Sequence, residues 1–232
     1  MKLNDLLESS IEDDIAQAMT AANLQPTKIP KNMDADNLQP YNHSHNTNIK
    51  SNPVVDGPTA IRAAQDILKH CQPFIKEWGG IPTPEHAMYR GMDGGWPDNI
   101  LYHTQALRKP IGMQRDTQKV LDDYFEQEFG HRYRSVNTLF ISGDITHVHQ
   151  FGEAHVVFPV GNFSYLWSNQ IDDLNYELMF SNVHEIVSYA NFKHNEGLST
   201  IGNHEVMINT KLYYAIPYKI YKRSVYPLLI KG

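Results

Sequence analysis

Three short motifs each carry a polar residue that could act on a phosphorylated sugar substrate. Arg90 lies between Tyr89 and Gly91, Ser142 follows an apolar run, and Glu205 precedes one. A planar guanidinium can bind phosphate oxygens through two parallel hydrogen bonds. A carboxylate can stabilise positive charge that develops on a sugar ring, and a hydroxyl can hold such groups in place. The apolar surroundings predict a site built at the ends of β-strands.

The order of arginine, serine and glutamate resembles the Arg–Ser–Glu pattern of mono-ADP-ribosyltransferases of the toxin-like and phage types. These enzymes split NAD and transfer its ADP-ribose to a target. Tyr89-Arg90-Gly91 matches the family's first motif and follows a predicted helix. In the second motif, Ser142 is matched but Gly143-Asp144 replaces the family's Thr-Ser. Asn203-His204-Glu205 matches the third, Glu-x-Glu or Gln-x-Glu, at its final glutamate, and the resemblance covers about residues 59–220.

The resemblance implies that NAD is the substrate and assigns roles to the matched residues. Arg90 would hold an NAD phosphate, with Tyr89, Gly91 and Ser142 also at the NAD site. Gly91 would let the backbone approach the ligand closely, because glycine has no side chain. Glu205 would be the catalytic carboxylate, acting with Ser142 and Arg90.

The resemblance also implies a macromolecular acceptor, either protein or nucleic acid. In the family, the residue two before the catalytic glutamate is a glutamate with arginine acceptors and a glutamine with others. Asn203 occupies this position, and its neutral amide cannot deprotonate a guanidinium. We therefore expect an acceptor other than arginine, recognised by Asn203, His204 and the polar loop over residues 193–202.

Composition narrows the class of protein. The chain has 232 residues, 41% of them hydrophobic, and a net charge of −6, which argues against a general basic field for nucleic acid. Its single cysteine, Cys71, excludes an internal disulfide and a cysteine-rich zinc site, and its apolar neighbours predict a core position. A polar, acidic start predicts no signal peptide, and no apolar run would span a membrane. We expect a cytoplasmic protein, in the host cell if the chain is viral.

The spacing of apolar residues divides the chain into two parts. Residues 3–22 predict an amphipathic helix, which either packs on the domain or docks a partner. Residues 25–56 predict a polar arm. The remaining residues, 57–232, predict an α+β domain with helices over 61–75, after Asp116-Thr117 and over 172–189. Asp116 or Thr117 is the expected cap of the second helix. Strands are expected at 138–141, 155–160, 163–167, 205–208 and 212–216, with a tight turn at Gly161-Asn162. The resemblance implies an ADP-ribosyltransferase-like pair of split β-sheets with flanking helices.

Other hypotheses follow from the remaining motifs. His147 and His149 would share one face of a strand, near His155, although no His-Glu-x-x-His motif supports a metal site. A basic region comprises Arg108, Lys109, Arg115, Arg132 and Arg134. It is either a solvated face or a second phosphate-binding site, for NAD or for nucleic acid, in which Tyr133 would stack on a base. One of the aromatic residues Phe151, Phe163, Tyr165 and Trp167 could contact nicotinamide, although all four suit a core.

Two further functions stay open at this point. The chain could be a non-catalytic binding or structural protein, for example of viral origin, that keeps the same fold. The N-terminal helix and arm would then dock it into an assembly. It could also be an RNA phosphotransferase on a related fold, although the net negative charge counts against an RNA substrate.

Overall fold

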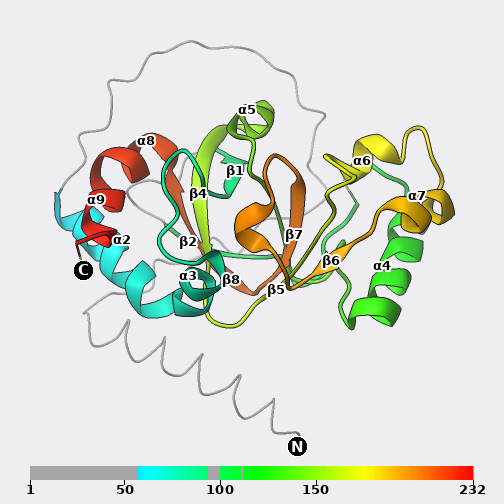
Figure 1. Cartoon of the computed structure of the whole chain (residues 1–232), viewed down its shortest axis with the longest axis horizontal. Helices are drawn as coiled ribbons and strands as arrows, with labels where there is room; N and C mark the ends of the chain where they lie inside the picture. Colours follow the sequence, from blue (N-terminus) through cyan, green and yellow to red (C-terminus); the bar gives the residue numbers. More distant parts are fainter. Residues whose placement is uncertain (1–56, 94–99, 111, 232) are drawn as a thin grey trace, which may run out of the picture. The chain divides into compact units, whose positions relative to one another are not determined.

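The computed structural model describes residues 57–93, 100–110 and 112–231 (Figure 1), so the predicted N-terminal helix and arm lie outside the described residues. The described chain is α+β, with an antiparallel sheet between groups of helices. The strands are β1 (Tyr89–Met92), β2 (Leu101–His103), β3 (Thr138–Ser142), β4 (Glu153–Pro159), β5 (Ser164–Trp167), β6 (Lys193–His194), β7 (Glu205–Asn209) and β8 (Leu212–Pro217). They lie in the order β2-β8-β4-β1-β3-β7-β5-β6, and every pair of neighbours is antiparallel.

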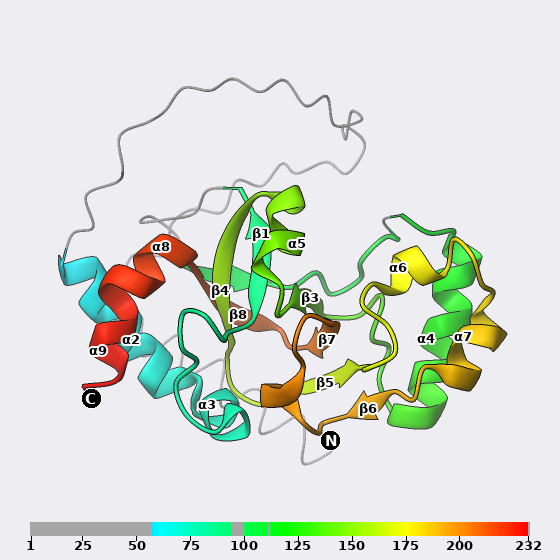
Figure 2. The ribbon, with the colours of Figure 1, turned by 45° about the horizontal axis from the view of Figure 1, so that its top comes forward.

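The helices form two groups at the ends of this sheet (Figures 1 and 2). One group lies beside β4 and β8 and the other beside β5 and β6. The first comprises α2 (Gly57–His70), α3 (Gln72–Trp78), α8 (Tyr218–Ile220), the π-helical η3 (Tyr221–Val225) and α9 (Tyr226–Leu229). The second comprises α4 (Arg115–Phe129), α6 (Leu174–Glu177) and α7 (Val183–Tyr189); α5 (Ile145–Val148) and the 3-10 helices η1 (His149–Phe151) and η2 (Leu198–Thr200) complete the described elements. Within the described residues, no helix is both long and apolar enough to cross a membrane.

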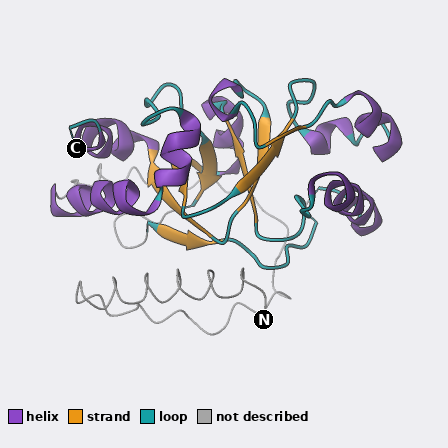
Figure 3. Cartoon of the chain, turned by 60° about the horizontal axis from the view of Figure 1, so that its bottom comes forward, coloured by secondary structure: helices purple, strands orange, loops and turns teal. Residues whose placement is uncertain are grey.

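Aromatic and aliphatic side chains bury both groups of helices against the strands (Figure 3 shows the layers). On α4, Leu121 and Phe125 pack with Leu166 of β5 and Met207 of β7. At the other end, the Phe74 ring of α3 meets the Phe158 ring edge-on at 5.5 Å between centroids. Cys71, at the end of α2, is fully buried, as its apolar neighbours predict.

A single residue pair joins the two halves of the sheet. β1 pairs with β3 only through Tyr89 and Ser142, whereas β1–β4 and β3–β7 are paired along their lengths. β4 and β5 are connected by the predicted turn, where Gly161 has a φ of 67°. The two strands do not form a hairpin, however, because β4 belongs to one half and β5 to the other.

The five strands expected from the sequence are confirmed to within two residues, but two predicted helices are interrupted. The helix expected over 61–75 stops at His70 and restarts at Gln72. Pro73 occupies the first turn of α3, where its missing N–H is tolerated, but it cannot continue α2. The chain therefore changes direction at Cys71.

The helix expected over 172–189 is also two helices. The Asp173 carboxylate caps α6 by accepting from the backbone N–H of Asn175 and of Tyr176. A capping box between Asn182 and Glu185 starts α7. Local side-chain capping thus outweighs a continuous apolar stripe in this segment.

Two local predictions were wrong. α4 is preceded by Gln114 and has no side-chain cap, so neither Asp116 nor Thr117 is the cap residue; Asp116 lies in the first turn, where its charge favours the helix. His147 and His149 lie in α5 and η1 and not on a strand, because the Asp144 side chain caps α5 immediately after β3.

Backbone packing after β3 gives a test of the fold. A Cβ on Gly143 would lie 1.7 Å from the carbonyl oxygen of Gly202, and no rotamer change can relieve a contact with backbone. Gly143→Ala should therefore lower the free energy of unfolding in urea by about 1–3 kcal/mol. Gly57→Ala, where a Cβ meets nothing within 4 Å, should leave it unchanged or raise it by up to about 1 kcal/mol. Equal midpoints for the two variants would contradict this packing.

Candidate functional site

The three residues singled out from the sequence come from neighbouring strands. Ser142, the last residue of β3, is paired with Tyr89 of β1 on one side and with Glu205 of β7 on the other. Arg90 follows Tyr89 directly and is paired with His155 of β4. The sheet therefore brings the backbones of the three motifs side by side, although 115 residues of sequence separate Arg90 from Glu205.

Ser142 fixes the backbone around this place. Its side chain is buried, and its hydroxyl donates to the carbonyl oxygen of Asn203 at 3.0 Å and accepts from the N–H of Asp144 at 3.0 Å. The first bond holds the segment that leads into Glu205, and the second shapes the turn into α5. Ser142 thus organises the backbone on both sides of β3, and it makes no hydrogen bond to the Glu205 carboxylate.

The carboxylate of Glu205 is held by Arg134. The distance from Arg134 Nη1 to Glu205 Oε1 is 2.9 Å, and the two side chains are only 4% and 16% exposed, respectively. Arg134 also donates to Asn175 Oδ1 at 2.7 Å and contacts Met207 Sδ at 3.6 Å. Burial raises the pKa of Glu205 above its usual value, and the nearby charges act in both directions: Arg134 lowers it and Asp173 raises it further.

Two more guanidiniums lie beside this pair. Arg90 Nη1 donates to the carbonyl oxygen of Phe140 at 3.1 Å, whereas its buried Nε has no hydrogen-bond partner. The guanidinium carbons of Arg108 and Arg134 lie 4.2 Å and 4.5 Å from the centroid of the Phe140 ring. Burial, together with repulsion from Arg90 and Arg134, lowers the pKa of Arg108 to about 10, so that it remains charged at neutral pH.

The local charge is therefore unbalanced. Arg90, Arg108 and Arg134 lie near Glu205, and the charge of Asp173 also acts on this carboxylate; among the described residues neither Arg90 nor Arg108 forms an ion pair. Clustered like charges are destabilising unless something compensates them. A phosphate group would do so, because guanidinium N–H groups match its oxygens.

The neighbours of Arg90 have structural roles. Tyr89 is buried, its hydroxyl donates to the Pro84 carbonyl oxygen at 2.6 Å, and burial raises its pKa to about 12. This burial argues against the predicted contact between Tyr89 and a ligand. A Cβ on Gly91 would lie 2.2 Å from the Val148 carbonyl oxygen, so the absence of a side chain there permits close packing of α5 on β1.

The predicted acceptor-recognition residues lie on the segment that enters β7. Asn203 is exposed, and its backbone is bound by Ser142. The Nδ1 atom of His204 lies 2.7 Å from Asp172 Oδ1, and its ring lies 6.0 Å from that of Trp167. Both residues are therefore next to Glu205 in sequence and in space, with the Asn203 side chain open to solvent.

The basic region divides into residues with different roles. Arg134 and Arg108 belong to the site, whereas Arg132 pairs with Glu126 on the surface at 2.8 Å. Tyr133 is fully buried and has no surface on which a base could stack. The predicted alternative in which Tyr133 stacks on nucleic acid is thus contradicted by its burial.

The sequence did not single out Asn175 or Phe140 as site residues. Asn175 reaches the site because the cap at Asp173 starts α6 there. Phe140 lies two residues before Ser142, on the same face of β3. The alternation of side chains along a strand could therefore have identified Phe140 as a neighbour of the site. Among the described residues, no group of three His, Cys, Asp or Glu side chains is placed to bind a metal ion.

Comparisons of this chain with models of protein families, with curated proteins and with solved structures found no match. Its function must therefore be inferred from its own residues and their geometry.

The raised pKa of Glu205 predicts how stability depends on pH. The Glu205 carboxyl binds its proton more tightly in the folded protein than in the unfolded chain. The free energy of unfolding should therefore fall as pH rises from the usual glutamate pKa of 4.5 through the higher pKa of the folded state. Glu205→Gln cannot ionise and should lack this decrease. Urea unfolding from below pH 4.5 to about pH 8 would measure it.

The matched control is Glu128→Gln, which removes an exposed carboxylate from α4. Its stability should follow that of the parent protein across the same pH range. A constant offset between the parent and Glu205→Gln would contradict the raised pKa, since only the slope reports the titration.

Proposed function

We propose that this protein is an NAD-dependent mono-ADP-ribosyltransferase that transfers ADP-ribose to a macromolecular acceptor. One observation carries the proposal: the register that pairs Tyr89 with Ser142 and Ser142 with Glu205 gathers the three motifs at one junction. The resemblance in sequence predicts that these three motifs lie side by side. In an unrelated sheet, their convergence would be a coincidence. The single pair between β1 and β3 also suits the split sheets of the family.

The phosphates of NAD suit the guanidiniums of the site. Arg90 has an unused, buried N–H donor, and Arg108 stacks on Phe140 without a carboxylate partner among the described residues. Two guanidiniums can share the charge of a pyrophosphate, and their mutual repulsion would fall on binding. Ser142 would act through the backbone, by fixing the segment around Asn203 relative to β3.

The carboxylate of Glu205 suits the cleavage step. When nicotinamide leaves NAD, positive charge develops on the ribose, and a nearby carboxylate in a poorly hydrated site stabilises that charge. Arg134 binds Glu205 Oε1, and no described residue bonds the other oxygen, which is left to accept a hydrogen bond from a ribose hydroxyl. Asn203, exposed beside Glu205, would then contact an acceptor other than arginine. We place this activity in the cytoplasm.

Loss of the carboxylate should abolish transfer. Purified protein incubated with labelled NAD and cell lysate should label protein or nucleic acid, whereas Glu205→Gln should reduce labelling by roughly 10³-fold, because the charge on the ribose is no longer stabilised. Glu128→Gln is the control that removes an exposed carboxylate and should label at the parent rate. Binding of NAD measured by calorimetry should survive in Glu205→Gln if Arg90 and Arg108 hold the phosphates.

The outcomes separate the alternatives. Nicotinamide release without labelling would indicate NAD hydrolysis. Full labelling by Glu205→Gln would refute the mechanism. No NAD binding at all would refute the proposed function and favour a non-catalytic protein on this fold. Label transfer that depends on phosphorylated RNA would instead favour an RNA phosphotransferase.

Arg134 should act as a positioning residue for Glu205. Arg134→Lys keeps the charge but loses the fork that bonds both Glu205 and Asn175, so we expect turnover to fall by roughly 10²-fold with little change in the KM for NAD. Arg134→Met also removes the charge that lowers the pKa of Glu205, so the acid limb of its pH–rate profile should move to higher pH. An unshifted profile in Arg134→Met, with turnover reduced only in proportion to the folded fraction, would show a purely structural role.

A further inference from the structure

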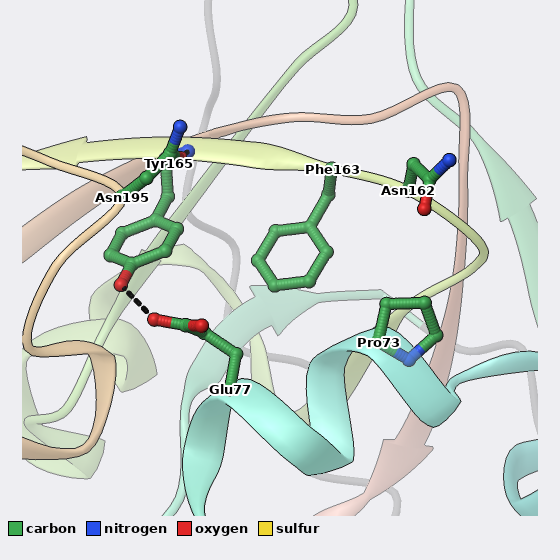
Figure 4. A pocket seen from close by; sticks show the side chains of 6 residues that line it. All are labelled: Pro73, Glu77, Asn162, Phe163, Tyr165 and Asn195. Carbon is green, nitrogen blue, oxygen red and sulfur yellow. Dashed lines mark hydrogen bonds between the residues drawn. The ribbon is translucent and has the colours of Figure 1, made fainter.

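A pocket lies apart from the arginine and glutamate residues of the proposed active site. It has a volume of about 160 Å³ and is lined by Pro73, Glu77, Asn162, Phe163, Tyr165 and Asn195. Figure 4 shows the Phe163 and Tyr165 rings directed from the β5 side toward α3, which carries Glu77 and Pro73. The opening is large enough for one side chain or a small ion, and smaller than typical pockets for cofactors.

The carboxylate in this pocket is fixed in place. The Tyr165 hydroxyl donates to Glu77 Oε1 at 2.6 Å, so one oxygen of Glu77 is bound and the carboxylate cannot rotate freely. Burial and the charges of Glu77 and Glu196 raise the pKa of Tyr165, which therefore stays a hydrogen-bond donor. Among the described residues, neither Glu77 nor Glu196 forms an ion pair, so the negative charge here lacks a cation.

An aromatic wall faces the same space. Phe163 is partly exposed, and its ring stacks on that of Tyr165 with centroids 5.9 Å apart and planes at 27°. The Phe74 ring also lies 6.0 Å from that of Phe163, at an angle of 55°. A rigid aromatic face beside a carboxylate binds cations by two effects at once, the ring quadrupole and the ion pair.

The amides complete the set of polar groups. Asn195 accepts from the backbone N–H of Tyr165 at 2.8 Å, which fixes the loop after β6 as a wall of the pocket. Asn162 is exposed and offers a free carboxamide oxygen to an N–H donor. Acceptor oxygens of Glu77, Asn162 and Asn195 thus line the opening, and an anion would meet the Glu77 carboxylate.

We propose that this pocket binds the guanidinium of an arginine side chain that belongs to a basic segment of a partner protein. A guanidinium is flat, so it can lie on the Phe163 ring while its N–H groups reach the Glu77 carboxylate and the Asn162 amide. A lysine ammonium would gain the ion pair but not the stacking. The Glu77 carboxylate, which forms no ion pair within the part of the chain that the structure describes, favours approach of a basic partner to this pocket.

This docking needs no chemistry from Glu205. The pocket shares with the proposed active site only the loop between β6 and β7, in which Asn195 lines the pocket and Asn203 adjoins Glu205. Binding of arginine here is therefore a separate property, which can hold whether or not the protein transfers ADP-ribose.

The experiment is an NMR titration of the full-length protein with N-acetyl-arginine amide, in the absence of NAD. We expect saturable shifts confined to the backbone and side-chain amides of Asn162, Phe163, Tyr165 and Asn195. N-acetyl-glutamine amide, which is neutral and of similar length, should cause none. N-acetyl-lysine amide should bind more weakly than the arginine compound, since it cannot stack on Phe163.

Two variants test the carboxylate and the ring. Glu77→Gln should weaken arginine binding roughly tenfold, because it removes a charge-assisted pair, and Phe163→Leu should weaken it about threefold while keeping an apolar wall. The surface variant Glu128→Gln and the site variant Glu205→Gln should bind as the parent does. Equal shifts with the neutral amide, shifts spread over surface carboxylates, or unchanged affinity in Glu77→Gln would each overturn the proposal. Failure here with intact NAD-dependent labelling would leave the proposed function standing.

Discussion

The organisation of the site depends on one residue pair, Tyr89 with Ser142, through which β1 meets β3. Every other residue pair between neighbouring strands at this junction belongs to one half of the sheet or the other, although the Arg90 side chain also bonds the Phe140 carbonyl of β3. Ser142 is also paired with Glu205, and its hydroxyl bonds the Asn203 carbonyl and the Asp144 N–H. The register therefore sets where Arg90, one residue past the pair, lies relative to Glu205. Residues paired directly across strands share a face, so Tyr89, Ser142 and Glu205 lie on one face of a regular sheet and Arg90 on the other. The Arg90 side chain reaches β3 through its hydrogen bond to the Phe140 carbonyl oxygen.

The charges around Glu205 add little to stability. A buried ion pair such as Arg134–Glu205 contributes little net stabilisation, because removing two charges from water offsets their attraction. Adding Arg90 and Arg108 without carboxylates introduces repulsion that folding alone does not require. In the function that we propose, the phosphates of NAD would relieve this repulsion, because they carry the opposite charge.

The sequence predicted the parts of the fold that local patterns determine. Alternating apolar residues located the strands that carry Ser142 and Glu205, and Cys71 was correctly placed in the core. The interruptions at Pro73 and Asn182 were not anticipated, because an apolar stripe continues across both while capping and proline geometry end the helices. β2 and β6 are too short for alternation to show, and the helices after Pro217 were missed as well.

The pairing of Arg134 with Glu205 could not be predicted, since no sequence pattern reports a contact between residues that far apart. The loop from β6 to β7, by contrast, could be identified from its polar residues and glycines. That loop is held at several points: Asn195 bonds Tyr165, the Glu196 carbonyl accepts from Trp167 Nε1, and Ser142 binds the far end. A loop fixed in this way presents its exposed groups without a large loss of conformational entropy on binding. In the function that we propose, this ordered segment would present its exposed groups to an acceptor beside the Glu205 carboxylate.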